Sequence, residues 1–256
     1  MFIDTHCHLN DERYENIDEI VARMRENGVT KAICAGYDAA SSLRAQKLAE
    51  RYGEVYFTAG IHPDAQQTAT AENLKIIEEL CAHEKCAAVG EIGLDYHYAP
   101  FDKEGQKRAF SAQVELAARL ALPFCVHARD CTADMLEFLS AQKEFLKNGF
   151  VMHCFSGSAE TAERLVELGA YISFAGTLTF KNARTLPQAA AAVPEDRLLT
   201  ETDSPYLSPH PFRGETNEPA RVKYVAEKLA EIRGRSAASL AGIVADNAER
   251  IFKRIK

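Results

Sequence analysis

The chain has 256 residues, of which 46% are hydrophobic and 26% are charged. This mixture is typical of a soluble globular protein and excludes a mainly disordered or fibrous chain. The 30 basic and 37 acidic residues give a formal net charge of −7. Long-range electrostatics therefore do not favour a polyanion such as duplex DNA as a partner.

The cellular compartment is suggested by features that the sequence lacks. No apolar run approaches the roughly 18–20 residues that a membrane span needs. The first residues, MFIDTHCHLNDE, have neither the basic start nor the apolar centre of a signal peptide. The seven cysteines are scattered without a CxxC pair, which is typical of reduced thiols. We therefore expect a cytoplasmic protein that does not bind a membrane.

Short apolar runs rich in β-formers recur along the chain, and helical patterns separate them. The eight runs are Phe2–His6, Lys31–Ala35, Val55–Gly60, Ala87–Glu91, Phe124–His127, Phe150–His153, Tyr171–Phe174 and Arg197–Glu201. Several are apolar on both faces, as parallel strands buried on both sides should be. We predict that each run is a strand.

The segments between the runs have the periodicity of amphipathic helices. Ile17, Ile20, Val21 and Met24 are spaced i, i+3, i+4 and i+7, which places them on one helix face. Similar stripes predict helices around residues 74–81, 110–118, 222–229 and 240–251. Strands that alternate with helices form either a parallel barrel or an open doubly wound sheet. Nothing marks a domain boundary, so we expect one domain over residues 1–256.

Polar residues at the ends of the runs distinguish these two folds. Histidines or acidic residues lie at or just past the end of five runs: His6, His8, Glu91, His127, His153 and Asp203. His62 follows the third run in the same way. The C-terminal ends of barrel strands converge on one axis, whereas those of an open sheet spread along a line. A shared site therefore favours a (β/α)8 TIM barrel.

The chemistry of this set predicts a metal site. His6 and His8 are two residues apart on an extended chain, so both imidazoles face the same side. Imidazoles and carboxylates suit divalent ions such as zinc, manganese, nickel and magnesium. A lone histidine at a strand end is usually structural, so the prediction depends on the whole set. Six such groups exceed the three protein ligands of one catalytic zinc, which suggests two ions that share a carboxylate.

Seven motifs in order resemble those of the TatD family of metal-dependent deoxyribonucleases. They are FIDTHCHL at the start, GIHP at 60–63, GEIGLDY at 90–96, VHARD at 126–130, HCFSG at 153–157, ETDSPYL at 201–207 and RGETNEP at 213–219. The resemblance implies an amidohydrolase-like barrel with two metal ions at its C-terminal face. It further implies that His6, His8 and Asp203 bind the first ion and that His127 and His153 bind the second. Glu91 would bridge the two ions.

The reported activities of that family are 3′–5′ exonuclease or DNase action and, in some members, removal of D-amino acids from tRNA. We predict cleavage of single-stranded DNA, or of RNA, from the 3′ end by a hydroxide that the two ions generate. Asp203 would bind metal and accept the proton, with Glu91 as the second catalytic residue. A D-aminoacyl-tRNA deacylase, another ester or amide hydrolase, and a non-catalytic metal-binding protein are the alternatives.

Four further residues are candidates for binding the substrate. Arg129 lies two residues after His127, and Arg213 lies in the loop after the last run with Asn217 nearby. Arginine matches the geometry of phosphate with two hydrogen bonds, although each arginine could equally form a structural ion pair. His62 would contact a substrate phosphate or support the metal ligands.

Two other features of the sequence bear on the site. Tyr96, Tyr98 and Phe101 form an aromatic loop that either stacks on unpaired bases or packs the loop itself. Glu201 lies two residues before Asp203 and points the same way from deeper in the barrel, which suggests a supporting role. The sequence shows no obligate protein partner, and it leaves the native ion and the oligomeric state open.

Overall fold

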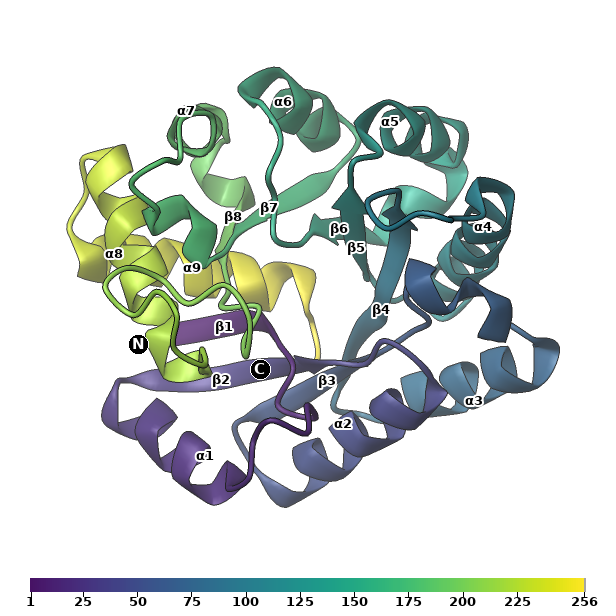
Figure 1. Ribbon diagram of the computed structural model, residues 1–256, viewed down its shortest axis with the longest axis horizontal. Coiled ribbons are helices and arrows are strands. Elements are labelled where there is room, and N and C mark those ends of the chain that lie inside the picture. Colours follow the sequence, from purple (N-terminus) through teal and green to yellow (C-terminus); the bar gives the residue numbers. More distant parts are fainter. Residues whose placement is uncertain (256) are drawn as a thin grey trace.

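The computed structural model describes residues 1–255. Within them, eight parallel strands form one sheet whose spatial order follows the chain. The strands are β1 (Phe2–Cys7), β2 (Val29–Ala35), β3 (Val55–Ala59), β4 (Cys86–Asp95), β5 (Phe124–Arg129), β6 (Phe150–Met152), β7 (Ala170–Phe174) and β8 (Leu198–Thr200). Figure 1 shows them as an inner ring that helices surround.

Nine α-helices lie in these residues, and α8 and α9 both follow β8. They are α1 (Ile17–Glu26), α2 (Ala39–Arg51), α3 (Ala71–Cys81), α4 (Lys103–Arg119), α5 (Thr132–Ala141), α6 (Ala159–Glu167), α7 (Leu186–Ala192), α8 (Val222–Arg233) and α9 (Ala237–Ile251). Six begin at a polar side chain that accepts a backbone N–H of the first turn, which fixes where they start: Asn16, Asp38, Thr70, Asp102, Ser158 and Ser236.

The sheet closes into a barrel between its first and last strands. The backbone N–H of Asp203, just past β8, donates to the carbonyl oxygen of His6 on β1 at 2.9 Å. The N–H of Thr202 donates to the buried carboxylate of Asp4 at 2.9 Å. These bonds lie at the C-terminal ends of the two strands, so they bring candidate ligands from β1 and β8 together.

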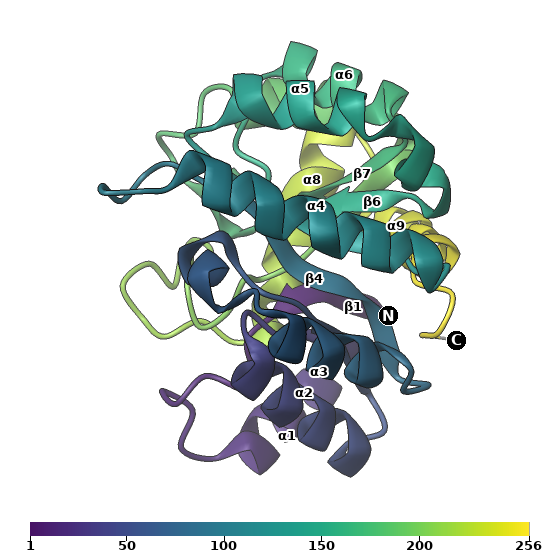
Figure 2. The same cartoon turned by 90° about the vertical axis from the view of Figure 1, so that its right-hand side faces the viewer.

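The opposite end of the barrel is covered by α9. Apolar side chains of α9 and the residues after it pack against the lower interior of the strands, among them Ala245, Ala248, Ile251, Phe252, Ile3, Ile33, Val151 and Leu199. Figure 2 shows α9 and both termini at one end of the molecule and the long loops at the other. The loop-bearing end holds the C-terminal ends of the strands, where barrel enzymes place their active sites.

The predicted barrel is confirmed, and each of the eight apolar runs overlaps one strand. The largest difference is in β4, which continues past the predicted end at Glu91 to Asp95. No helix within residues 1–255 is long and apolar enough to cross a membrane. All seven cysteines are free thiols, and six of them are buried.

Candidate metal centre

A cavity of about 560 Å³ opens at the C-terminal end of the barrel. Five of the six predicted ligands line it: His8, Glu91, His127, His153 and Asp203. His6 lies with them but is buried, within 3.4 Å of both His8 and Glu91. Strands that are far apart in sequence therefore bring all six predicted ligands to one place.

His6, His8 and Asp203 form a first cluster beside one oxygen of Glu91. The Nε2 atoms of His6 and His8 are 3.4 Å apart, and His8 Nε2 lies 3.4 Å from Asp203 Oδ1. His6 Nε2 lies 3.4 Å from Glu91 Oε2. Ligand atoms at about 2.1 Å from a tetrahedral ion are about 3.4 Å apart, so this spacing fits a divalent ion.

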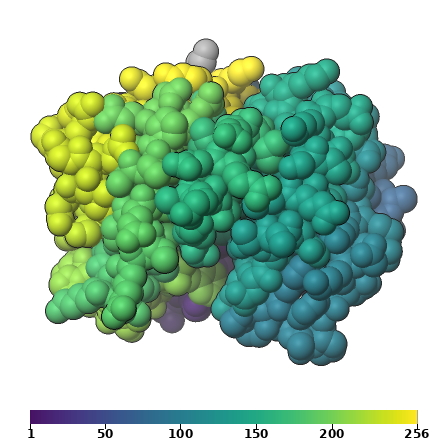
Figure 3. All heavy atoms as spheres, turned by 90° about the horizontal axis from the view of Figure 1, so that it is seen from above, coloured from purple at the N-terminus to yellow at the C-terminus, as the bar shows by residue number. Residues whose placement is uncertain are grey.

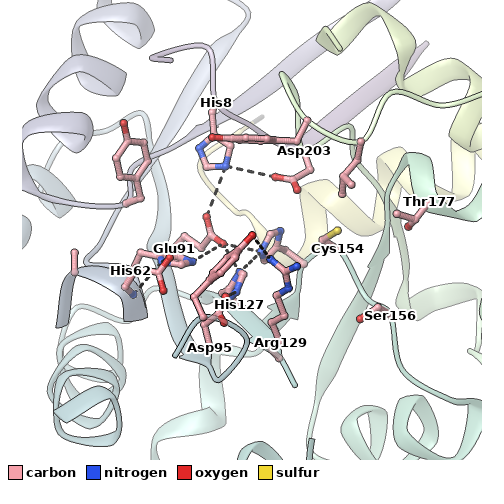
Figure 4. Close-up of a pocket in the computed structure, with 18 residues that line it drawn as sticks. His8, His62, Glu91, Asp95, His127, Arg129, Cys154, Ser156, Thr177 and Asp203 are labelled. Atoms are coloured by element: carbon pink, nitrogen blue, oxygen red, sulfur yellow. Dashed lines mark hydrogen bonds and ion pairs between the residues drawn. The ribbon is translucent and has the colours of Figure 1, made fainter. Parts of the chain in front are cut away.

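His127 and His153 form a second cluster beside the other oxygen of Glu91. His153 Nε2 and His127 Nδ1 lie 2.7 and 2.9 Å from Glu91 Oε1, and 3.3 Å from each other. Figure 4 shows His8 and Asp203 on one side of Glu91 and His127 on the other. One carboxylate thus faces both clusters, which is the arrangement that a two-ion site with a shared ligand needs.

Each histidine of the second cluster has a carboxylate on its other ring nitrogen. His127 Nε2 lies 2.9 Å from Asp95 Oδ2, and His153 Nδ1 lies 3.3 Å from Glu201 Oε1. A proton on these outer nitrogens leaves the inner nitrogens free to bind metal and fixes the rings. The structure thus brings Glu201 to the supporting place that its sequence position suggested.

Asp95 was missed by the sequence reasoning, although a signal for it was present. Glu91, Gly93 and Asp95 alternate along β4, so they share one face of an extended strand. Gly93 pairs with His127 at a φ of +150°, and a Cβ there would lie 2.0 Å from the His127 carbonyl oxygen. Only glycine allows this approach, which places Glu91 and Asp95 on either side of His127.

The electrostatics of the site hold the carboxylates of Glu91 and Asp203 in the ionised form. Burial opposes ionisation of Glu91, but His153, His127 and His6 outweigh burial and hold the pKa of this carboxyl well below its usual range. Burial likewise opposes ionisation of Asp203, and contacts with histidines, His8 foremost, lower its pKa. Metal ligands must be deprotonated, so both carboxylates fit that role.

His62 also reaches the site, with Nε2 3.7 Å from Glu91 Oε1. Burial and the neighbouring His127 lower the pKa of His62 to about 3, so its ring is neutral at pH 7. Its Nδ1 accepts a hydrogen bond from the backbone N–H of Asp64 at 3.2 Å. The ring proton therefore resides on Nε2, which makes His62 a neutral donor that faces the cavity.

The two predicted phosphate-binding arginines occupy different places. Arg129 lines the cavity, and its guanidinium carbon lies 5.1 Å from the centre of the Tyr98 ring. Arg213 is outside the cavity lining, and its guanidinium carbon lies 3.8 Å above the Phe180 ring. Only Arg129 is thus placed beside the ligand clusters.

Asn217 does not face the cavity, contrary to the expectation that it contacts substrate. Its side chain is fully buried, and its amide nitrogen donates to the carbonyl oxygens of Thr202 and Tyr206 at 3.0 and 2.7 Å. Its side-chain oxygen accepts the N–H of Glu218. These bonds fully occupy the amide, so Asn217 shapes the loop that follows β8.

A parallel barrel with histidines and carboxylates at the C-terminal ends of its strands is the architecture of metal-dependent hydrolases. The sequence matches the family described as TatD related DNase over residues 3–253. The chain therefore belongs to the TatD family and is a metal-dependent hydrolase.

Several known proteins are similar over nearly the whole chain. The "Uncharacterized metal-dependent hydrolase YabD" of Bacillus subtilis is 42% identical over 254 residues, which are 99% of each chain. The "3′-5′ ssDNA/RNA exonuclease TatD" of Shigella flexneri is 34% identical over 92% of each chain. The crystal structure of YJJV, a TatD homolog from Escherichia coli, superposes with a TM-score of 0.93 at 32% identity, covering 98% of each chain.

Proposed function

We propose that the protein is a 3′–5′ exonuclease that hydrolyses phosphodiester bonds of single-stranded DNA or RNA. The observation that carries this proposal is the position of Glu91, whose two oxygens face separate ligand clusters at the base of an open cavity. The similarity to relatives named 3′–5′ ssDNA/RNA exonucleases supports the choice of substrate.

We assign the two clusters to two divalent ions. His6, His8 and Asp203 would hold the first ion, His127 and His153 would hold the second, and Glu91 would serve both. Magnesium, manganese, zinc or nickel, when bound, would lower the pKa of a water and neutralise charge on the phosphate. All six ligands come from one chain, so the centre does not require a partner subunit.

The protein supplies the remaining groups for hydrolysis. Asp203, which is ionised, accepts a proton from the attacking water as the water oxygen bonds to phosphorus. His62 donates a hydrogen bond from Nε2–H to a non-bridging oxygen, and Arg129 binds the phosphate of a neighbouring nucleotide. The bond between phosphorus and the 3′ oxygen of the preceding nucleotide then breaks, and the terminal nucleotide leaves with a 5′-phosphate. The 3′ oxygen takes up a proton from solvent water, and Asp203 releases to solvent the proton that it accepted.

The shape and charge of the molecule favour an unpaired end over a duplex. A cavity of about 560 Å³ is in the range of small-molecule sites, and it suits a strand end better than the side of a helix. The net charge of −7 provides little long-range attraction for duplex DNA. We also propose that residues 1–256 form a single domain. Because its seven cysteines are free thiols, we propose that the protein works in the cytoplasm.

The test is cleavage of a 5′-labelled single-stranded oligonucleotide by the wild type and by Asp203→Asn. The reactions would contain Mg²⁺, Mn²⁺ or Zn²⁺, with EDTA as control. We expect a descending ladder that EDTA and the substitution both abolish, while Asp203→Asn still binds the strand. Absence of cleavage with every ion would overturn the proposal and favour a D-aminoacyl-tRNA deacylase or another ester or amide hydrolase.

A further inference from the structure

Two exposed tyrosines stand at the mouth of the cavity. Tyr98 lies in the loop between β4 and α4, and Tyr206 lies in the loop between β8 and α8. Both line the cavity, yet 65% of Tyr98 and 47% of Tyr206 is exposed. Figure 3 shows a notch at one edge of the molecule, between green segments that follow β7 and β8 and blue ones that follow β4. The two rings therefore belong to loops on opposite sides of this notch.

The Tyr206 ring is held in place by its neighbours. The guanidinium carbon of Arg13 lies 4.1 Å from the centre of the ring, and Arg13 is itself fixed by two hydrogen bonds to Asp11 at 2.9 and 2.8 Å. The imidazole of His8 lies edge-on, with the ring centres 6.0 Å apart. One face of the tyrosine is thus backed by a cation, and the ring stands next to the first cluster.

Tyr98 has the corresponding position beside the second cluster. The guanidinium carbon of Arg129 lies 5.1 Å from the centre of its ring, and Arg129 follows His127 by two residues on β5. Tyr96, in the same loop, differs because it is buried, donates to Asp134 at 2.9 Å and stacks on Phe101. Tyr96 therefore packs the loop, whereas packing does not account for the exposed ring of Tyr98.

We infer that Tyr206 and Tyr98 are stacking platforms for the two bases that flank the scissile phosphate. The ligand clusters lie between the loops that carry Tyr98 and Tyr206, so a phosphate bound there directs its two nucleosides toward opposite rings. Aromatic rings bind bases of any sequence through their flat faces, and only unpaired bases can reach them. This inference rests on the proposed nuclease function, and it gives the preference for single strands a structural cause.

The experiment uses oligonucleotides with 2-aminopurine at the last or the second-last position, bound to full-length Asp203→Asn protein. We expect the fluorescence of 2-aminopurine to be quenched on binding, because stacking quenches it. Tyr206→Leu and Tyr98→Leu should each remove the quenching at one position and weaken binding about tenfold. Tyr206→Phe and Tyr98→Phe keep the ring and should restore both signals.

A second measurement changes the strand rather than the protein, and then combines the two changes. Removing the base at either position, with the sugar–phosphate backbone intact, should also weaken binding about tenfold. Each leucine variant should show no further loss of affinity when the base that stacks on its own ring is removed. If the wild type cuts oligonucleotides but both the quenching and the abasic penalty are absent, the stacking inference is wrong and the nuclease proposal stands. If neither the wild type nor any variant binds or cuts a single strand, the nuclease proposal itself fails.

Discussion

The two ligand clusters on either side of Glu91 differ in how their imidazoles are held. In the second cluster, His127 and His153 each contact a carboxylate through the nitrogen that faces away from Glu91. In the first cluster, His8 Nδ1 faces only a backbone carbonyl oxygen, that of Ala35, at 3.3 Å. The carboxylate of the first cluster is Asp203, which contacts the ion-facing nitrogens directly.

This difference separates two ways of binding a cation. The outer carboxylates of the second cluster orient the imidazoles and make them more basic without touching an ion. The first cluster has a charged oxygen within reach of the ion, and Asp203 is also free to accept a proton. We therefore expect the second cluster to act mainly as a rigid holder and the first to take the larger part in proton transfer.

Glu91→Gln should have the largest effect, because Glu91 is the group that both clusters share. An amide loses the negative charge and cannot bind two ions equally, so several kcal/mol of stabilisation disappear. We expect kcat to fall about 10³-fold or more and both ions to bind weakly. Steady-state kinetics and metal analysis of the purified protein would measure this. A matched control is Glu54→Gln, which removes only a surface ion pair with Arg25. Retention of one tightly bound ion by Glu91→Gln would show that the clusters are independent.

Removal of metal should lower the thermal stability of the wild type. An ion at a hundred times its dissociation constant stabilises the folded state by about 2.7 kcal/mol. For a chain of this size that corresponds to a fall in Tm of about 5–10 °C on addition of EDTA. Differential scanning calorimetry with and without EDTA would measure the shift. Asp203→Asn should show a smaller shift, since it lacks one ligand. An equal Tm in both conditions would argue against an ion in either cluster.

Asp95→Asn and Glu201→Gln test the second cluster alone. Loss of an outer carboxylate typically weakens metal binding about 10–100-fold, because the ring loses its orientation and basicity. We expect one of the two ions to be lost at low free metal while the other remains. Asp64→Asn is the control, because Asp64 lines the same cavity and its carboxylate lies 3.6 Å from His62, which is not one of the six predicted ligands. Calorimetric titration of the apo protein would measure both affinities. Equal weakening of both ions would contradict the distinction between the clusters.

The barrel and the convergence of the six ligands could be predicted because both follow from simple periodicities. Apolar runs marked the strands, and the polar residues after them had to meet once the sheet closed. Asp95 was missed because the predicted strand stopped at Glu91, whereas β4 continues to Asp95. The alternation of Glu91 and Asp95 across Gly93 becomes visible only when that longer strand is assumed.

The loops beyond the strands could not be placed in the same way. Sequence distance from the strands put Asn217 and Arg213 near the site, but their contacts depend on how a long loop folds back. The side-chain amide of Asn217 donates to backbone carbonyl oxygens of that loop, and the guanidinium of Arg213 lies over the Phe180 ring. Arg129, by contrast, is carried into the cavity by β5, whose register is fixed by the sheet. Residues on a strand or within three residues of its C-terminal end were therefore predictable, and residues further along the loops were not.

Arg129→Ala and Arg213→Ala turn this contrast into the last and smallest test. Arg129 lies on the strand of the second cluster and lines the cavity, so its loss should raise KM for an oligonucleotide about tenfold, as expected for one charged hydrogen bond. Arg213→Ala should change KM less than about twofold, because a surface cation over an aromatic ring contributes little to a site it does not line. Both variants should keep kcat near that of the wild type, since neither arginine is a candidate ligand. Steady-state kinetics on one single-stranded substrate would measure both. If Arg213→Ala raises KM as much as Arg129→Ala, the strand must extend from the cavity over Phe180, and the loop after β8 would then contribute to binding as much as β5 does.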